Sequence, residues 1–182
     1  MILAHLADLH LGFRQFHRQT PAGLNQREAD VAHAFRTAID QIIGAKPDIV
    51  VVAGDIFHSV RPTNPAILFA FRQFQRLREA LPEAPVVVLA GNHDSPRSVE
   101  TGSILGLLDT LGITTVPDVM RRLTFPELPD LAILAVPDVA VRSGERVFRP
   151  EGDEKYQVLL LHGAIPNLYA WEKHAPEYVG GL

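Results

Sequence analysis

The sequence contains no cysteine, so neither a disulfide framework nor a thiolate metal site can form in these 182 residues. It also lacks any uninterrupted apolar run near the length of about 18 residues that a membrane-spanning helix requires. Basic residues are not in excess, because the formal net charge is −4 and the isoelectric point is about 6.0. The composition therefore does not indicate electrostatic binding of nucleic acid over the whole protein surface, and a polyanion would have to bind at a local site.

The N-terminal residues do not resemble an export signal. The opening "MILAHLADLHLG" has no basic region, and His5, Asp8 and His10 interrupt its apolar residues. We therefore expect a cytoplasmic protein with no membrane association. Hydrophobic residues make up 47% of the chain and charged residues 21%, which fits one globular domain over residues 1–182. We find no repeats, linkers or low-complexity segments.

Strand and helix patterns alternate through the first two thirds of the chain. Apolar runs at 2–7, 48–53, 85–90 and 113–116 predict strands. Asn25 with Glu28 predicts the start of a first helix, and Gly44 predicts its end. Asn64-Pro65 predicts the start of a second helix, and residues 103–112 are expected to form a short third helix. Helical spacing then predicts the buried stripes, which are Val31, Phe35, Ala38, Ile39 and Ile42, followed by Ile67, Phe71, Phe74 and Leu77.

This alternation predicts the α/β class, with a mainly parallel sheet and helices on its faces. After Val116 the helical patterns fade. Residues 121–125, 131–136 and 156–162 read as strands separated by proline-rich turns. A second, more antiparallel sheet is expected there.

Polar side chains follow four of these apolar strands, at the point where each strand ends. The carboxyl ends of parallel strands meet at one edge of a sheet, so these residues are expected to lie together. The residues concerned are Asp8 and His10, then Asp55 and His58, then Asn92, His93 and Asp94, and finally His162.

The residue types in these clusters indicate metal chemistry. Carboxylate, amide and imidazole ligands without sulfur suit Mn²⁺, Fe²⁺ or Zn²⁺. A carboxylate can also bridge two ions about 3.5–4 Å apart, the spacing found in two-metal hydrolases. Gly54 and Gly91 directly precede the ligands, where a backbone without Cβ can turn sharply.

Each cluster taken alone has a simpler interpretation. Asp-x-His is common, Gly-Asp after a strand is usually a turn, and Gly-Asn-His-Asp could be a polar turn. Their occurrence in order, each after an apolar run, favours the metal site. The other histidines give weaker evidence of a function. His5 is expected to be packed and His33 to be exposed, whereas His17 and His174 have no partner that we can name.

Four arginines follow the polar clusters closely, at positions 14, 18, 61 and 97. They are either solvated loop residues or contacts to phosphate beside the ions, which guanidinium geometry favours. We select Arg14, Arg61 and Arg97 as candidate substrate-binding residues.

As an ordered set, these residues resemble the calcineurin-like metallophosphoesterases. "DLHLG", "GDIFHSVRP" and "GNHDSPRS" are most similar to the SbcD-type DNA repair exonucleases, whose eukaryotic relatives form the Mre family. The resemblance implies a β-sandwich flanked by helices. It also implies a two-metal DNA exonuclease or endonuclease that cleaves phosphodiester bonds at DNA ends in double-strand-break repair.

The resemblance also implies a role for each matching position. Asp8 and His10 would hold one ion, Asp55 would bridge both, and Asn92 and His162 would hold the other. His93 would act on the scissile phosphate, assisted by His58. The ions would be two divalent cations, with Mn²⁺ favoured and Fe or Zn as alternatives. Partners implied are DNA, a second copy of the chain, and an SMC-like ABC ATPase of the SbcC/Rad type.

One family feature is missing, the Gly-His-x-His motif that follows the position of His162 in the pattern. We therefore expect an incomplete domain that lacks its C-terminal strands, with weak Mn²⁺ binding and little nuclease activity from these residues alone. Two other functions stay open: a phosphomonoesterase or cyclic phosphodiesterase on the same scaffold, and an inactive fragment that only binds DNA or dimerises.

Overall fold

A parallel sheet forms the centre of the computed structural model, which describes residues 1–95, 102–143 and 148–163. Its strands are β1 (Leu3–Leu6), β2 (Ile49–Ala53), β3 (Val86–Leu89) and β4 (Thr114–Val116), paired in that order. Every pair is parallel, and the register aligns Leu6 with Val52 and Ala53 with Leu89. The carboxyl ends of the strands therefore meet at one edge of the sheet.

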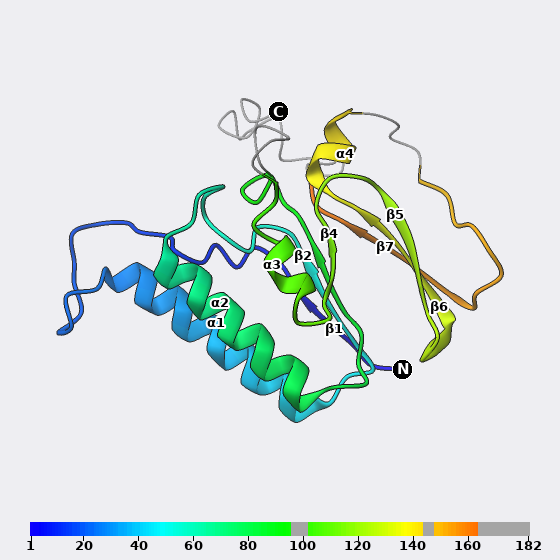
Figure 1. Ribbon diagram of the computed structural model, residues 1–182, viewed down its shortest axis with the longest axis horizontal. Helices are drawn as coiled ribbons and strands as arrows, with labels where there is room; N and C mark the ends of the chain where they lie inside the picture. Colours follow the sequence, from blue (N-terminus) through cyan, green and yellow to red (C-terminus); the bar gives the residue numbers. More distant parts are fainter. Residues whose placement is uncertain (96–101, 144–147, 164–182) are drawn as a thin grey trace, which may run out of the picture.

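Two long helices cover one face of this sheet (Figure 1). Helix α1 (Gln26–Ala45) begins at Asn25, whose side chain accepts hydrogen bonds from two backbone N–H groups of the first turn. Helix α2 (Asn64–Ala80) begins at Thr63, which caps it in the same way. Their buried side chains meet the inward side chains of β2 and β3; from the helices these are Phe35, Ile39, Ile42, Ala66, Ala70, Phe74 and Leu77.

A second sheet packs against the other face of the first (Figure 1). It consists of β5 (Arg121–Phe125), β6 (Leu128–Val136) and β7 (Tyr156–Leu161), with β6 in the centre. Side chains alternate between the two faces of a sheet, so those on the facing sides of the two sheets fill the space between the sheets. The buried residues from the second sheet are Leu123, Phe125, Leu131, Ile133, Ala135 and Leu160.

Backbone hydrogen bonds bring the segments after β3, β6 and β7 together at the carboxyl ends of the two sheets. The N–H of Asp138 donates to the carbonyl of Ala90, which follows β3, at 3.3 Å. The N–H of His162 donates to the carbonyl of Val136 at the end of β6. The segment after β7 is thereby brought to the same edge as the segments after β1, β2 and β3.

The α/β sandwich predicted from the sequence is confirmed, with several corrections. The helices cover only one face of the parallel sheet, because the second sheet occupies the other. That second sheet is mixed, since β5 and β6 are antiparallel but β6 and β7 are parallel. The third helix is only α3 (Gly106–Asp109), and α4 (Asp138–Ser143) was not predicted. His5, expected to be packed, is exposed because β1 is an edge strand.

Smaller expectations can also be compared with the structure. Helix α1 runs one residue beyond Gly44 and ends at Ala45, and the capping residue Lys46 adopts a left-handed conformation with φ of 48°. His33 is exposed, as predicted. Within the described part of the chain, no helix has the length and apolar character needed to cross a membrane.

The packing of the two sheets predicts the effect of two substitutions on stability. Ile133→Ala should lower the free energy of unfolding by about 2–5 kcal/mol, because Ile133 is fully buried between the sheets and its loss leaves a cavity. Leu159→Ala, on the adjacent strand but 47% exposed, should change it by only about 0.5 kcal/mol. Urea unfolding of both variants measures the difference, and equal losses would argue against the sandwich interface.

Candidate metal centre

The backbone itself places the first two polar clusters side by side. Beyond the ends of β1 and β2, the two segments continue to exchange hydrogen bonds. Asp8 N–H donates to Gly54 O at 3.2 Å, and His10 N–H donates to Asp55 O at 2.9 Å. The polar residues that follow the two strands therefore lie next to each other on a hydrogen-bonded framework.

Three of these residues have unusual backbone conformations. Asp8, His10 and Asp55 have φ values of 54°, 45° and 53°, in the left-handed region that residues with a Cβ rarely adopt. Conformations of this kind persist only where the surroundings enforce them, and they cluster at functional sites. Here they turn the side chains from the strand ends toward a common point.

The carboxylate of Asp55 lies at that point and is 3% exposed. One oxygen, Oδ1, accepts a hydrogen bond from the backbone N–H of His93 at 3.0 Å and lies 3.5 Å from His162 Nε2. The other, Oδ2, lies 3.5 Å from His10 Nε2. No Lys or Arg of the described residues forms an ion pair with Asp8 or Asp55. A buried carboxylate without such a partner requires another source of positive charge.

Two glycines provide the space for this arrangement. A Cβ added at Gly91 would overlap Oδ1 and the backbone nitrogen of Asp55. A Cβ added at Gly54 would overlap the ring of His162, and Gly54 also has a φ of 80°. The sequence suggested that Gly54 and Gly91 allow sharp turns. The structure shows that glycine is needed at these positions mainly because the candidate ligands approach them closely.

His162 is oriented as a metal ligand would be. Its Nδ1 lies 2.8 Å from the carbonyl of Ala53, which can only accept, so Nδ1 carries the proton and Nε2 carries the lone pair in the neutral ring. Nε2 then faces Oδ1 of Asn92 at 3.2 Å and Oδ1 of Asp55 at 3.5 Å. Three electron-pair donors converge without a proton between them, and this set fits a divalent cation.

Donor atoms of Asp8, Asp55 and His162 lie within 4.8 Å of one another, which makes these residues one possible ligand group. His10, His58 and His93 form a second group by the same measure. The chemistry and spacing of these donors therefore suit divalent cations, and the oxygen-rich group of Asp8, Asp55 and His162 contains the two carboxylates that the sequence singled out.

The imidazoles of the second group are packed together at the mouth of the site. The rings of His58 and His93 are stacked with centroids 5.3 Å apart, and His10 meets His93 edge-on at 4.9 Å. Burial lowers the pKa of His58, and the neighbouring His93 and His10 lower it further. The ring of Phe13 packs against that of His58 with ring centroids 4.7 Å apart, a contact that the sequence did not predict.

Asp94 holds the loops that carry these residues. Its carboxylate accepts hydrogen bonds from the backbone N–H groups of Ile56, Phe57 and Gly91, at 2.9–3.1 Å. Burial raises the pKa of Asp94, although the three donors oppose the shift. Sequence reasoning placed Asp94 in a polar cluster but gave it no role. Its position directly after His93 was the only available signal.

The structure brings most of the predicted site residues together, namely Asp8, His10, Asp55, His58, Asn92, His93 and His162. The arginines differ. Arg14 is exposed and paired with Glu28 of α1, whose hydrogen bond raises the pKa of Arg14. Arg61 is exposed. Arg97 and His174 lie outside the described residues. The role of each residue in chemistry stays a prediction.

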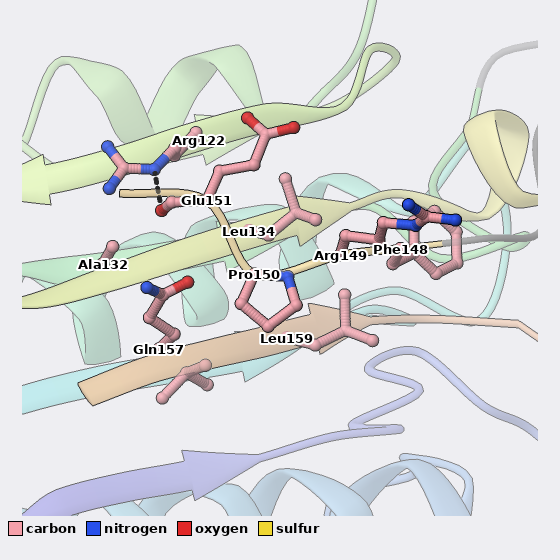
Figure 2. A pocket seen from close by; sticks show the side chains of 10 residues that line it. Arg122, Ala132, Leu134, Phe148, Arg149, Pro150, Glu151, Gln157 and Leu159 are labelled. Atoms are coloured by element: carbon pink, nitrogen blue, oxygen red, sulfur yellow. Dashed lines mark hydrogen bonds between the residues drawn. The ribbon is translucent and has the colours of Figure 1, made fainter. Parts of the chain in front are cut away.

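A separate pocket lies on the face of the second sheet that is turned away from the first (Figure 2). Arg122 crosses one end of it and donates to the backbone carbonyl of Glu151 at 3.1 Å. Arg122 is also paired with Glu154. None of the predicted site residues lines this pocket, whose remaining lining residues are Ala132, Leu134, Phe148, Arg149, Pro150, Gln157, Val158 and Leu159.

Comparison with known proteins agrees with the geometry. The family model described as calcineurin-like phosphoesterase matches residues 1–179. A protein named DNA double-strand break repair protein Mre11 from Sulfurisphaera tokodaii is 33% identical over 93% of this chain and 42% of its own length. Proteins of the same name from Methanocaldococcus jannaschii and Archaeoglobus fulgidus are 38% and 33% identical, over 59% and 91% of this chain. This chain spans 27% and 39% of those two proteins, so it covers less than half of each of these relatives.

The close approach of Gly91 to Asp55 yields a test of the centre. Gly91→Ala should displace the Asp55 carboxylate and weaken Mn²⁺ binding by about 10–100-fold, the usual cost of disturbing the groups that orient a ligand. Gly44→Ala is the matched control, because Gly44 lies exposed in α1 with no atom near an added Cβ. It should leave binding unchanged and raise stability by up to about 1 kcal/mol. Calorimetric titration with Mn²⁺ compares the two, and equal affinities would contradict the proposed position of the ions.

Proposed function

The chain belongs to the calcineurin-like phosphoesterase family, and on that premise we propose that residues 1–182 belong to the nuclease domain of a DNA double-strand-break repair protein. The observation that carries the proposal is the convergence of Asp8, Asn92 and His162 on the buried carboxylate of Asp55, which forms no ion pair with a Lys or Arg of the described residues. The similarity to proteins named for double-strand-break repair, which extends over 93% of the chain in one case, supports DNA as the substrate.

We propose that the oxygen-rich group holds two divalent ions. Asp8 and His10 would hold one ion, Asn92 and His162 would hold the other, and Asp55 would bridge both. The ions would polarise the phosphoryl oxygen and lower the pKa of a bound water so that it can attack phosphorus. Carboxylate and amide oxygens favour Mn²⁺ over softer ions, with Fe and Zn as alternatives.

The chain's own imidazoles would handle the proton. His93 Nδ1 lies 2.8 Å from the carbonyl of His58, so the proton of the neutral ring stays on Nδ1 and Nε2 is free to take up or release a second one. We propose that His93 Nε2 faces the scissile phosphate and donates a proton to the leaving oxygen. His58 assists by holding His93 through its carbonyl and by stacking against its ring.

The proposed partners follow from the similarity and not from a surface of this chain. They are DNA ends, a second copy of the chain, and an SMC-like ABC ATPase of the SbcC/Rad type. Arg14, Arg61 and Arg97 are the proposed phosphate contacts. For Arg14 this requires that the guanidinium exchange its pairing with Glu28 for a phosphate, which its exposed position permits.

The bridging role of Asp55 predicts how two substitutions should differ. Asp55→Asn removes the shared charge and should weaken both Mn²⁺ sites. Asn92→Ala should weaken mainly one, because the side chain of Asn92 contacts His162, a proposed ligand of one ion. Asp130→Asn, an exposed position in β6, is the control and should bind as the parent chain does. Titrations followed by the paramagnetic resonance signal of free Mn²⁺ count the sites, and two intact sites in Asp55→Asn would refute the bridge.

The proton-transfer role of His93 predicts a loss of cleavage without a loss of ions. With the chain in excess over substrate, we expect Mn²⁺-dependent release of nucleotides from linear duplex DNA and much slower hydrolysis of p-nitrophenyl phosphate. His93→Ala should slow DNA cleavage by about 10²–10⁴-fold, the range for general acid–base groups. Its Mn²⁺ affinity should stay close to the parent's, because no part in Mn²⁺ binding is proposed for His93.

Three outcomes would count against this function. Faster hydrolysis of the small ester than of DNA would favour a phosphomonoesterase. DNA binding without any Mn²⁺-dependent cleavage would favour a fragment that only binds DNA. Loss of Mn²⁺ together with cleavage in His93→Ala would place His93 among the metal ligands.

A further inference from the structure

Three imidazoles form a compact cluster that contains no carboxylate. His10, His58 and His93 come from three different connections, and one ring nitrogen from each lies within 4.8 Å of the others. Their ring centroids are 4.9–5.5 Å apart. The two-ion centre described above uses only His10 of these three, so the cluster as a whole has no assigned ligand.

The ring nitrogens of the cluster are incompletely paired. His10 Nδ1 and His58 Nδ1 are buried and have no hydrogen-bond partner among the residues that the structure describes. His93 Nδ1 is committed to the carbonyl of His58, which leaves the lone pair of the neutral ring on Nε2. Buried polar atoms are nearly always paired, so two unpaired nitrogens in one cluster of three rings indicate a missing partner.

The donor type determines which partner fits. Imidazole nitrogens favour Zn²⁺, whereas carboxylate and amide oxygens favour Mn²⁺. Three neutral imidazoles with one water complete the tetrahedral shell of many zinc sites, with Zn–N distances of about 2.0–2.1 Å. In that geometry the nitrogens lie about 3.4 Å apart, so ring movements of about 1 Å would close the present cluster around an ion.

We propose that His10, His58 and His93 form a zinc site distinct from the oxygen-rich two-ion centre, and that the two compete for His10. A neutral imidazole has a single lone pair, so His10 can bind one ion at a time. Its Nε2 lies 3.5 Å from Asp55, at the boundary between the two sites. Zinc in the cluster therefore withdraws a ligand from the Asp8–Asp55 position and ties up the nitrogens of His58 and His93.

The functional consequence rests on the proposed function, whereas the binding itself does not. If His93 transfers a proton to the leaving oxygen, zinc bound to His93 inhibits cleavage even when Mn²⁺ is abundant. The site would then make the nuclease sensitive to the ratio of the two metals and not only to the amount of Mn²⁺.

Zinc binding to the 182-residue chain at pH 7, measured by competition with a chromophoric chelator, tests the site. His58→Ala should lower zinc affinity by about 100-fold or more, since losing a group that merely orients a ligand already costs about 10–100-fold. Asp8→Ala should leave the affinity of the His58-dependent zinc site unchanged and weaken Mn²⁺ binding. His33→Ala is the matched control, because His33 is exposed on α1. Circular dichroism verifies that each variant is folded.

Two spectroscopic measurements separate this site from the two-ion centre. Co²⁺ in a three-nitrogen tetrahedral site gives strong visible absorption, which should be present in the parent chain and lost in His58→Ala. One equivalent of Zn²⁺ should release Mn²⁺ from one position, seen as a rise in the resonance signal of free Mn²⁺.

The outcomes keep the two proposals apart. Zinc affinity that is equal in the parent chain and His58→Ala, or that falls in Asp8→Ala as much as in His58→Ala, overturns the zinc site whether or not the chain cleaves DNA. Zinc affinity that depends on His58 and not on Asp8 supports the site even if no cleavage is found. Zinc binding without release of Mn²⁺ overturns the competition for His10.

Discussion

The buried carboxylate of Asp55 is the group on which the rest of the site depends. It contacts His10, the backbone of His93 and His162, and so it links the segments that follow β1, β3 and β7 to the end of β2. An isolated carboxylate in such a position would be costly, because burial removes its hydration and no Lys or Arg of the described chain pairs with it. Positive charge from bound ions would offset that cost. Asp55 then explains both why the loops converge and why the site needs cations.

The sandwich architecture makes this convergence possible. Parallel pairing places the ends of β1, β2 and β3 at one edge, and the second sheet delivers His162 to the same edge through β7. The left-handed conformations of Asp8, His10 and Asp55 are held there by hydrogen bonds between neighbouring segments. Asp94 adds three more backbone contacts from beneath. The ligands are thus positioned by rigid strands and a fixed framework, which suits chemistry that depends on precise distances.

The sequence predicts the strands of this protein better than it predicts the contacts between them. Uninterrupted apolar runs such as 49–53 identify buried parallel strands, and a cluster of polar residues after each one locates the site. The contact of His162 with the Ala53 carbonyl could not be predicted, because it involves a backbone atom more than a hundred positions away. Nor could the mixed pairing of β6 and β7, since hydrophobic alternation specifies a face and not a partner. Asp94 and Phe13 were missed because their contacts depend on how the loops fold back.

Because the net charge of the molecule is negative, bound ions would have a second function besides catalysis. With a net charge of −4 and two carboxylates at the site, the protein without cations would repel a phosphate backbone. Bound divalent ions are the largest local charges in such a site and reverse the sign of the field that the substrate meets. Under the proposed function, metal loading therefore controls DNA binding as well as the chemical step. The division of the site into an oxygen-rich and a nitrogen-rich half would then matter as well, because zinc in the nitrogen-rich half would occupy imidazoles that the substrate phosphate otherwise meets.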